Sequence, residues 1–288
     1  MAGNNPVFGR IQKQLQDEQG YAGFGQQRTQ QQGSPQQPGY YPPTPMSPEQ
    51  LDAMYQRPSA GPLDTGRVTF DDVIMKALGL FTLVVVVAGA TWVYTRSIAP
   101  ALTMPAMWGG MIGTLVLGFV IAFKKTISVP LILTYAVLEG LFVGAISMVL
   151  EQLYPGIVAT AVLATLCTFA GMFVGYRTGL VKVTSRTRRI FAFAAMGYFL
   201  FSLVNVFTQA VGWTHGWGIG DSNGLGVVIS VIGVGLASYS LAVDFDSIDQ
   251  GVRAGLPQKY SWLFAHGLIV SLVWLYIEIL RLLARFRD

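Results

Sequence analysis

The sequence has few of the residues on which soluble proteins and metalloproteins depend. Charged residues make up 12% of its 288 positions, whereas soluble domains contain roughly 25%. Cysteine occurs once, at Cys167, and histidine twice, at His215 and His266. An intrachain disulfide and a thiolate metal cluster are therefore excluded. So little charge cannot cover a water-facing surface, which favours a membrane protein.

The motifs of several enzyme classes are also missing. The sequence contains no His-Glu-x-x-His metalloprotease pattern and no glycine loop of the phosphate-binding type. The glycine-rich segment GIGDSNGLG connects two apolar runs and follows no strand. Basic residues do not gather into a patch with interleaved aromatic residues, which would indicate nucleic-acid binding. We therefore predict a protein that is not an enzyme, has no cofactor and no firmly assigned metal site, and binds no nucleic acid.

Residues 1–66 differ from the rest of the chain. They contain 13 glutamines and nine of the 14 prolines, but no long apolar run. Such a segment buries too little apolar surface to offset the entropy of ordering. We predict a disordered Gln/Pro/Gly-rich tail over residues 1–66 and a membrane domain over residues 67–288.

Beyond Arg67, apolar runs recur with short polar breaks. A ~30 Å hydrocarbon core takes about 20 residues of helix, and runs of this length form helices rather than barrel strands. We therefore predict an all-α integral membrane protein, a seven-transmembrane-helix bundle preceded by the tail. Glycines four residues apart, such as Gly140 and Gly144, predict close helix packing. The predicted spans are Ala77–Tyr94, Ala106–Phe123, Pro130–Leu150, Ile157–Tyr176, Ile190–Val211, Leu225–Val243 and Trp262–Leu283.

Basic residues in the breaks indicate the orientation. Lys124 and Lys125 fall in one break, and a basic set between Arg177 and Arg189 falls in another on the same side. The positive-inside rule then places the tail in the cytoplasm, and we expect a multi-pass protein of the bacterial plasma membrane. The basic residues that follow the last span do not fit this orientation, because seven spans would place them outside the cell. Either seven spans hold with an exception at the C-terminus, or one of the last two segments does not cross and the C-terminus lies inside.

Three acidic residues are candidates for a functional site, because an ionisable group at membrane depth is costly. They are Glu139, Asp244 and Glu278. A simpler interpretation exists for two of them: Glu278 pairs with Arg281 one turn on, and Glu139 stays neutral or bonds to another helix. Asp246, two residues after Asp244, points to a different helix face. For Asp246 and its neighbour Asp249 we favour a solvated acidic cap.

The C-terminal stretch DFDSIDQGVRAGLPQKYSWLFAHGLIVSLVWLYIEILRLL resembles the end of Bax inhibitor-1 family proteins. The segment YAVLEGLFVGAIS is similar to the Glu-Gly signature of that family, and NNPVF and RVTFDDVIMK resemble its actinobacterial branch. The resemblance covers about residues 67–288. It implies a paired carboxylate formed by an aspartate on the sixth helix and an acid on the seventh, which fall here on Asp244 and Glu278.

Two carboxylates held together in a dry site cannot both ionise cheaply, so such a pair shares a proton over some pH range. The resemblance thus implies a pH-sensitive calcium leak channel, with Asp244 and Glu278 as sensor and gate, Glu139 as a pathway acid and Ca²⁺ as the transported ion. The alternative that the resemblance also allows is a non-transporting regulator that binds another membrane protein, such as a membrane-bound protease. Two features depart from the family pattern. The second acid is a glutamate where aspartate is familiar, and the connection between the two acids is longer than in compact members. The acids differ in depth by ~12 Å if both helices run straight to Pro257, so a longer loop or tilted helices must absorb the difference.

Overall fold

The structure is a computed structural model that describes residues 66–214, 218–219 and 224–287. The predicted tail, apart from Gly66, and His215 lie outside the described residues. Seven helices in the described part are long and apolar enough to cross a membrane, which confirms the seven predicted spans. The helices are α3 (Phe70–Ser97), the short 3₁₀ helix η1 (Pro100–Leu102), α4 (Thr103–Phe123), α5 (Val129–Leu153), α6 (Ile157–Arg177), α7 (Ser185–Ala210), α8 (Gly224–Arg253) and α9 (Tyr260–Arg285).

Several helix ends are fixed by local polar contacts. Thr69 Oγ1 accepts the backbone N–H of Asp72 at 3.1 Å and so caps the start of α3. A capping box formed by Thr184 and Thr187 begins α7. α8 continues ten residues beyond its predicted end, because its last turns bury Phe245 and Ile248 on one side and are held by polar contacts of Asp246 on another. These long helices set the depth at which each acidic side chain lies.

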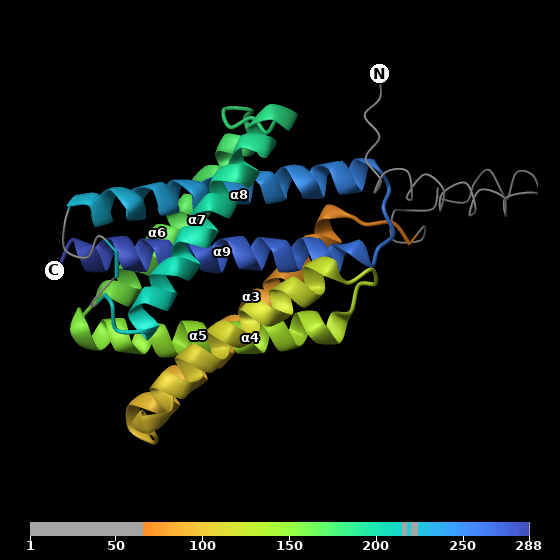
Figure 1. Ribbon diagram of the computed structural model, residues 1–288. Helices are drawn as coiled ribbons and strands as arrows, with labels where there is room; N and C mark the ends of the chain where they lie inside the picture. The colour runs from red at the N-terminus through yellow and green to blue at the C-terminus, as the bar shows by residue number, and fades with distance from the viewer. Residues whose placement is uncertain (1–65, 215–217, 220–223, 288) are drawn as a thin grey trace, which may run out of the picture. The chain divides into compact units, whose positions relative to one another are not determined.

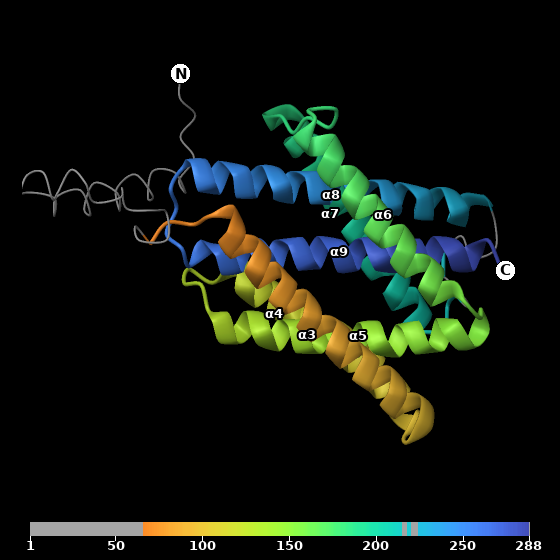
Figure 2. The same ribbon diagram turned by 180° about the vertical axis from the view of Figure 1, so that it is seen from behind.

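The helix α9 lies at the centre of the bundle. It packs against α3, α5, α6 and α8, and 61% of its most apolar window is buried, compared with 6% for α4 and for α7. Helices α8 and α9 run side by side and antiparallel, while α7 crosses them in front in Figure 1 and α6 crosses them in front in Figure 2. Side chains on α9 are therefore enclosed by protein on most sides.

Helix α5 lies between α3 and α4, and glycines allow the close approach (Figures 1 and 2). A Cβ atom on Gly144 would collide with the backbone of Ala88 on α3, and a Cβ atom on Gly140 would collide with Val87. On the other side, Gly110 of α4 packs against the backbone of α5. The close packing predicted from Gly140 and Gly144 is confirmed.

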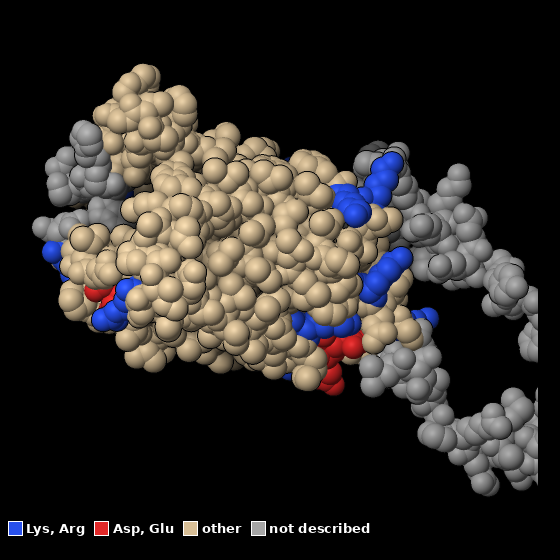
Figure 3. Space-filling model, turned by 90° about the horizontal axis from the view of Figure 1, so that it is seen from below, with Lys and Arg blue, Asp and Glu red and all other residues tan. Residues whose placement is uncertain are grey.

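On the face seen in Figure 3, lysine, arginine, aspartate and glutamate lie toward the two ends, and none is visible in the middle. At one end, Arg67 and Pro257 form an isolated β-bridge that joins the start of α3 to the α8–α9 connection. At the other end, Arg287 Nη1 donates to the carbonyl oxygen of Pro155 at 2.8 Å. The last helix therefore runs from the Arg67 end to the opposite end, which favours seven spans over six.

Candidate functional site

Asp244 lies on α8, nine residues before that helix ends, and its carboxyl group turns toward α9. It faces the hydroxyl group of Ser271, and a Cβ atom on Gly267 would lie 3.6 Å from Asp244 Oδ1. The other oxygen, Oδ2, is buried and has no hydrogen-bond partner among the described residues. A buried carboxylate oxygen without a partner is costly, so its charge calls for a proton or a cation.

Glu139 on α5 is the second buried acid, with 6% of its surface exposed. Tyr135, one helical turn earlier, faces its carboxyl group, and the Tyr135 ring packs edge-on against the ring of His266 on α9 at 4.4 Å. Glu139 Oε2 is buried and lacks a hydrogen-bond partner in the described part of the chain. Glu139 therefore resembles Asp244: in each residue, one buried carboxyl oxygen has no hydrogen-bond partner among the described residues.

The two acids lie at the same level of the bundle. Tyr135 meets His266, and farther along the same two helices Ser147 Oγ lies 2.7 Å from Tyr276 Oη. Helices α5 and α9 therefore run parallel, and Glu139, one turn beyond Tyr135, lies level with the segment of α9 just beyond His266. Asp244 faces that same segment, between Gly267 and Ser271. The two carboxyl groups approach it from different faces of α9, because α5 and α8 pack on different sides.

Glu278 is only 2% exposed and belongs to a separate cluster nearer the other end of α9. Tyr198 Oη on α7 donates to Glu278 Oε2 at 2.7 Å, and Trp274 Nε1 donates to Oε1 at 3.1 Å. Arg281 Nη2 lies 3.4 Å from Glu278 Oε1. The simple ion pair with Arg281 is thus present. Both carboxylate oxygens of Glu278 have partners, whereas Asp244 and Glu139 each have one oxygen without a partner among the described residues.

The predicted carboxylate pair between Asp244 and Glu278 is wrong in its geometry. Glu278 lies against Gly233 on α8, and Gly233 and Asp244 are 11 residues apart, about 16 Å along the helix. Asp244 lies about 14 Å from the end of α8, whereas Glu278 lies about 27 Å from the start of α9. The helices run straight and antiparallel, so neither tilt nor loop length absorbs this offset, and the two acids cannot share a proton.

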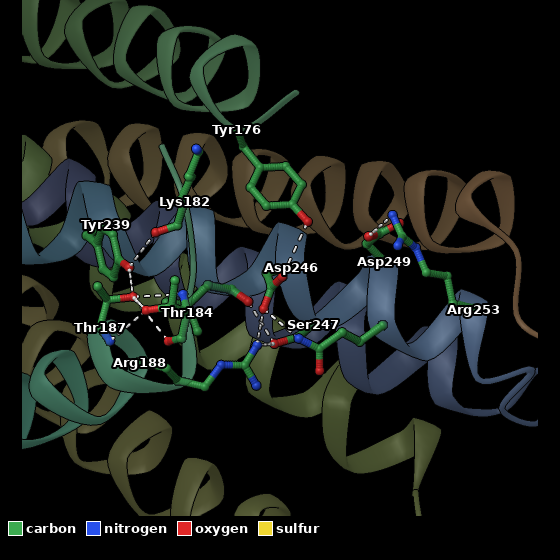
Figure 4. A network of polar contacts seen from close by, with 12 residues as sticks. Tyr176, Lys182, Thr184, Thr187, Arg188, Tyr239, Asp246, Ser247, Asp249 and Arg253 are labelled. Atoms are coloured by element: carbon green, nitrogen blue, oxygen red, sulfur yellow. Dashed lines mark hydrogen bonds and ion pairs between the residues drawn. The ribbon is translucent and has the colours of Figure 1, made fainter. Parts of the chain in front are cut away.

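Asp246 is more than a solvated cap, because it links three helices. Arg188 Nη2 on α7 donates to Asp246 Oδ2 at 2.5 Å, and Tyr176 Oη on α6 donates to Oδ1 at 3.5 Å (Figure 4). Asp249, by contrast, pairs with Arg253 on its own helix at 2.8 Å. The basic run at the start of α7 was a signal for such a partner, but it does not indicate which acid Arg188 meets.

Metal-ligating side chains do not gather in the described residues, since no three His, Cys, Asp or Glu side chains there could hold one ion. Asp244 and Glu139 approach α9 singly. A cation that passed them would meet one carboxylate at a time together with backbone and hydroxyl oxygens, which are ligands that calcium accepts. The arrangement suits a transient contact with an ion.

Comparison with known proteins identifies the family. A search of curated proteins finds none that matches this chain. The sequence profile of the Bax inhibitor 1 like family matches residues 5–288, and so extends into the tail beyond the part covered by the resemblance described above. The match spans nearly the whole chain and agrees with the seven membrane-crossing helices. The protein therefore belongs to the Bax inhibitor 1 like family of multi-pass membrane proteins.

Proposed function

We propose that this protein is a pH-sensitive calcium leak channel of the bacterial plasma membrane. The observation that supports the proposal is the pair of uncompensated carboxyl oxygens, Asp244 Oδ2 and Glu139 Oε2, which are buried at one level of the central helix α9. Asp244 is the proton sensor, and Glu139 is an acid of the pathway. Glu278 is a structural ion-pair residue.

The physical reason is that a buried carboxylate has to be compensated. Removing a charge from water is expensive unless a partner or a proton neutralises it, and polar groups inside a membrane domain commonly mark ion pathways. Asp244 and Glu139 have no partner for one oxygen each among the described residues. A proton satisfies that oxygen when protons are abundant, and a calcium ion satisfies it when they are scarce. Proton and cation therefore compete for the same atoms.

The link between Asp246 and Arg188 connects this competition to helix position. Arg188 lies close enough for its charge to act on Asp244 as well as on Asp246, to which it donates directly. A charged Asp244 draws the Arg188 guanidinium toward the bundle, and a protonated Asp244 leaves it with Asp246. The position of the α7 start relative to α8 then depends on the charge of Asp244.

The orientation in the membrane follows from the basic residues. Arg67 and the α4–α5, α6–α7 and α8–α9 connections belong to the end where the described chain begins. Together with the adjoining helix ends they carry most of the lysine and arginine of the described residues. The positive-inside rule assigns that end to the cytoplasm. Arg281 and Arg287 at the other end are engaged by Glu278 and by the carbonyl of Pro155, so they are explained by protein contacts rather than by topology.

The test is calcium flux into liposomes that contain the purified protein and a trapped calcium indicator. We expect flux above that of protein-free liposomes, and we expect its rate to change across a series of external pH values. Flux equal to that of protein-free liposomes at every pH would overturn the proposal. A partner membrane protein recovered by crosslinking to such a non-conducting protein would establish the regulator instead.

A further inference from the structure

A large apolar groove opens on the side of the bundle, and neither Asp244 nor Glu139 of the proposed pathway lines it. Its volume is about 620 Å³, within the ~300–1,000 Å³ typical of small-molecule sites. Helices α3 and α6 form its walls, and α8 and α9 form its floor. Figure 2 shows α6 in front of α8 and α9, and α3 in front of α9.

The lining consists of large apolar side chains that remain accessible. Ile74 is 53% exposed, and Phe173 on the opposite wall is 46% exposed. Ala77 is the one small residue among the described residues that line the groove. Helix–helix contacts in membranes favour glycine, alanine and serine, which let backbones approach. The lining is therefore unsuited to a further transmembrane helix, whether from a partner or from a second copy.

The groove occupies only half of the membrane. Its lining extends from Phe70 to Phe81 on α3 and from Leu166 to Arg177 on α6, which is about 16 Å on each helix. The hydrocarbon core is ~30 Å thick, so the groove matches one leaflet. A partner helix would need an apolar surface that crosses both leaflets. An acyl chain needs an apolar surface only as long as one leaflet, which is the length of this groove.

The polar end of the groove carries a positive charge. Arg177 lines it there, is exposed, and has no acidic partner within ion-pair distance among the described residues. The other charged lining residue, Asp249, is neutralised by Arg253. The α6–α7 connection adjoins Arg177 and contains Lys182, followed by Arg186 and Arg189 at the start of α7, without an acid between them.

We infer that this groove binds one anionic glycerophospholipid, with an acyl chain between α3 and α6 and the phosphate group at Arg177. An apolar groove of one-leaflet length that ends at Arg177, which has no acidic partner among the described residues, is complementary to such a lipid in shape and in charge. The inference does not depend on ion conduction.

Native mass spectrometry of the full chain in detergent tests the inference. The protein is mixed with phosphatidylglycerol or with phosphatidylcholine of the same acyl chains, and the lipid-bound fraction is measured. We expect phosphatidylglycerol to bind more tightly, and we expect Arg177→Gln to weaken its binding about fivefold, as for the loss of one surface cation. Arg177→Lys should retain the preference, and Arg96→Gln, which changes an exposed arginine in the last turn of α3, away from the charged end of the groove, should leave binding unchanged.

A second variant tests the apolar part of the site. Leu166→Trp fills the groove from the α6 wall and should reduce the binding of both lipids, whereas Leu163→Trp, on the exposed surface of the same helix, should not. Equal binding of the two lipids to the unaltered protein would overturn the inference. So would unchanged binding in Arg177→Gln and Leu166→Trp, or a dimer that Leu166→Trp dissociates, which would assign the groove to a second copy.

Discussion

Arg188 on α7 donates a 2.5 Å hydrogen bond to Asp246 on α8, and it joins the α6–α7 connection to the helix that carries Asp244 (Figure 4). The Arg188 side chain is 38% exposed and the Asp246 side chain is 15% exposed. Water therefore screens part of the attraction. Tyr176 and Gln250 also donate to the Asp246 carboxylate, so this acid is the centre of the network.

Asp246→Asn should loosen the α6–α7 connection and lower the free energy of unfolding by about 1 kcal/mol, the upper range for partly exposed ion pairs. Hydrogen exchange of residues 178–187 should become faster. The matched control is Asp249→Asn, which removes only the pair with Arg253 within α8. Equal exchange rates in the two variants would show that Asp246 does not hold the connection.

Ser147 and Tyr276 should contribute a modest interhelical hydrogen bond. Their oxygens lie 2.7 Å apart between α5 and α9, and such bonds in membrane proteins average about 0.6 kcal/mol. Tyr276→Phe and Ser147→Ala should each lower the unfolding free energy. The double variant should lose the energy of this hydrogen bond once, in addition to the effects of the two substitutions on packing. A double-mutant cycle with zero coupling energy would contradict the bond.

Gly144→Leu should destabilise the bundle strongly. The added side chain would collide with the Ala88 backbone on α3, and overpacking of this kind costs about 1–3 kcal/mol or more. Gly171→Leu is the control, because nothing lies within 4 Å of its Cβ position. The check is the melting temperature of the two purified variants in one detergent, and similar melting temperatures would rule out a tight α3–α5 contact.

Glu278→Gln should lower stability without a change in the pH dependence of calcium flux. The substitution leaves Arg281 without its acidic partner and weakens charge-assisted bonds from Tyr198 and Trp274, which together correspond to a loss of about 1–3 kcal/mol. Glu278→Gln combined with Arg281→Gln should recover part of the loss. Chemical unfolding of the unaltered protein and of the two variants measures it, and full stability in Glu278→Gln would refute a structural role.

The number of spans and the tight α3–α5 contact were predictable from sequence, because both depend on local composition. A membrane-crossing run needs only sufficient apolar length, and glycines such as Gly140 and Gly144 act through their missing side chains. The end of α8 was less predictable, because its last turns are amphipathic and lie beyond the apolar run.

The partners of the acids were not predictable, because they depend on how far one long helix is displaced along another. Asp244 and Glu278 each fit a family position, yet the straight antiparallel course of α8 and α9 separates them. The Arg188–Asp246 bond joins residues 58 positions apart, and no local spacing rule connects them. The level that Glu139 shares with Asp244 likewise follows from the parallel packing of α5 and α9.

The most direct test of the proton-sensing role of Asp244 is the calcium flux of reconstituted Asp244→Asn over a series of pH values, compared with the unaltered protein and with Glu278→Gln. Asparagine keeps the size of the side chain but cannot exchange a proton. We predict that the pH dependence of flux is clearly weaker in Asp244→Asn than in the unaltered protein, with Glu139 left as the one uncompensated acid of the proposed pathway, whereas flux through Glu278→Gln follows the pH dependence of the unaltered protein. An unchanged pH dependence in Asp244→Asn, or its loss in Glu278→Gln alone, would contradict the account.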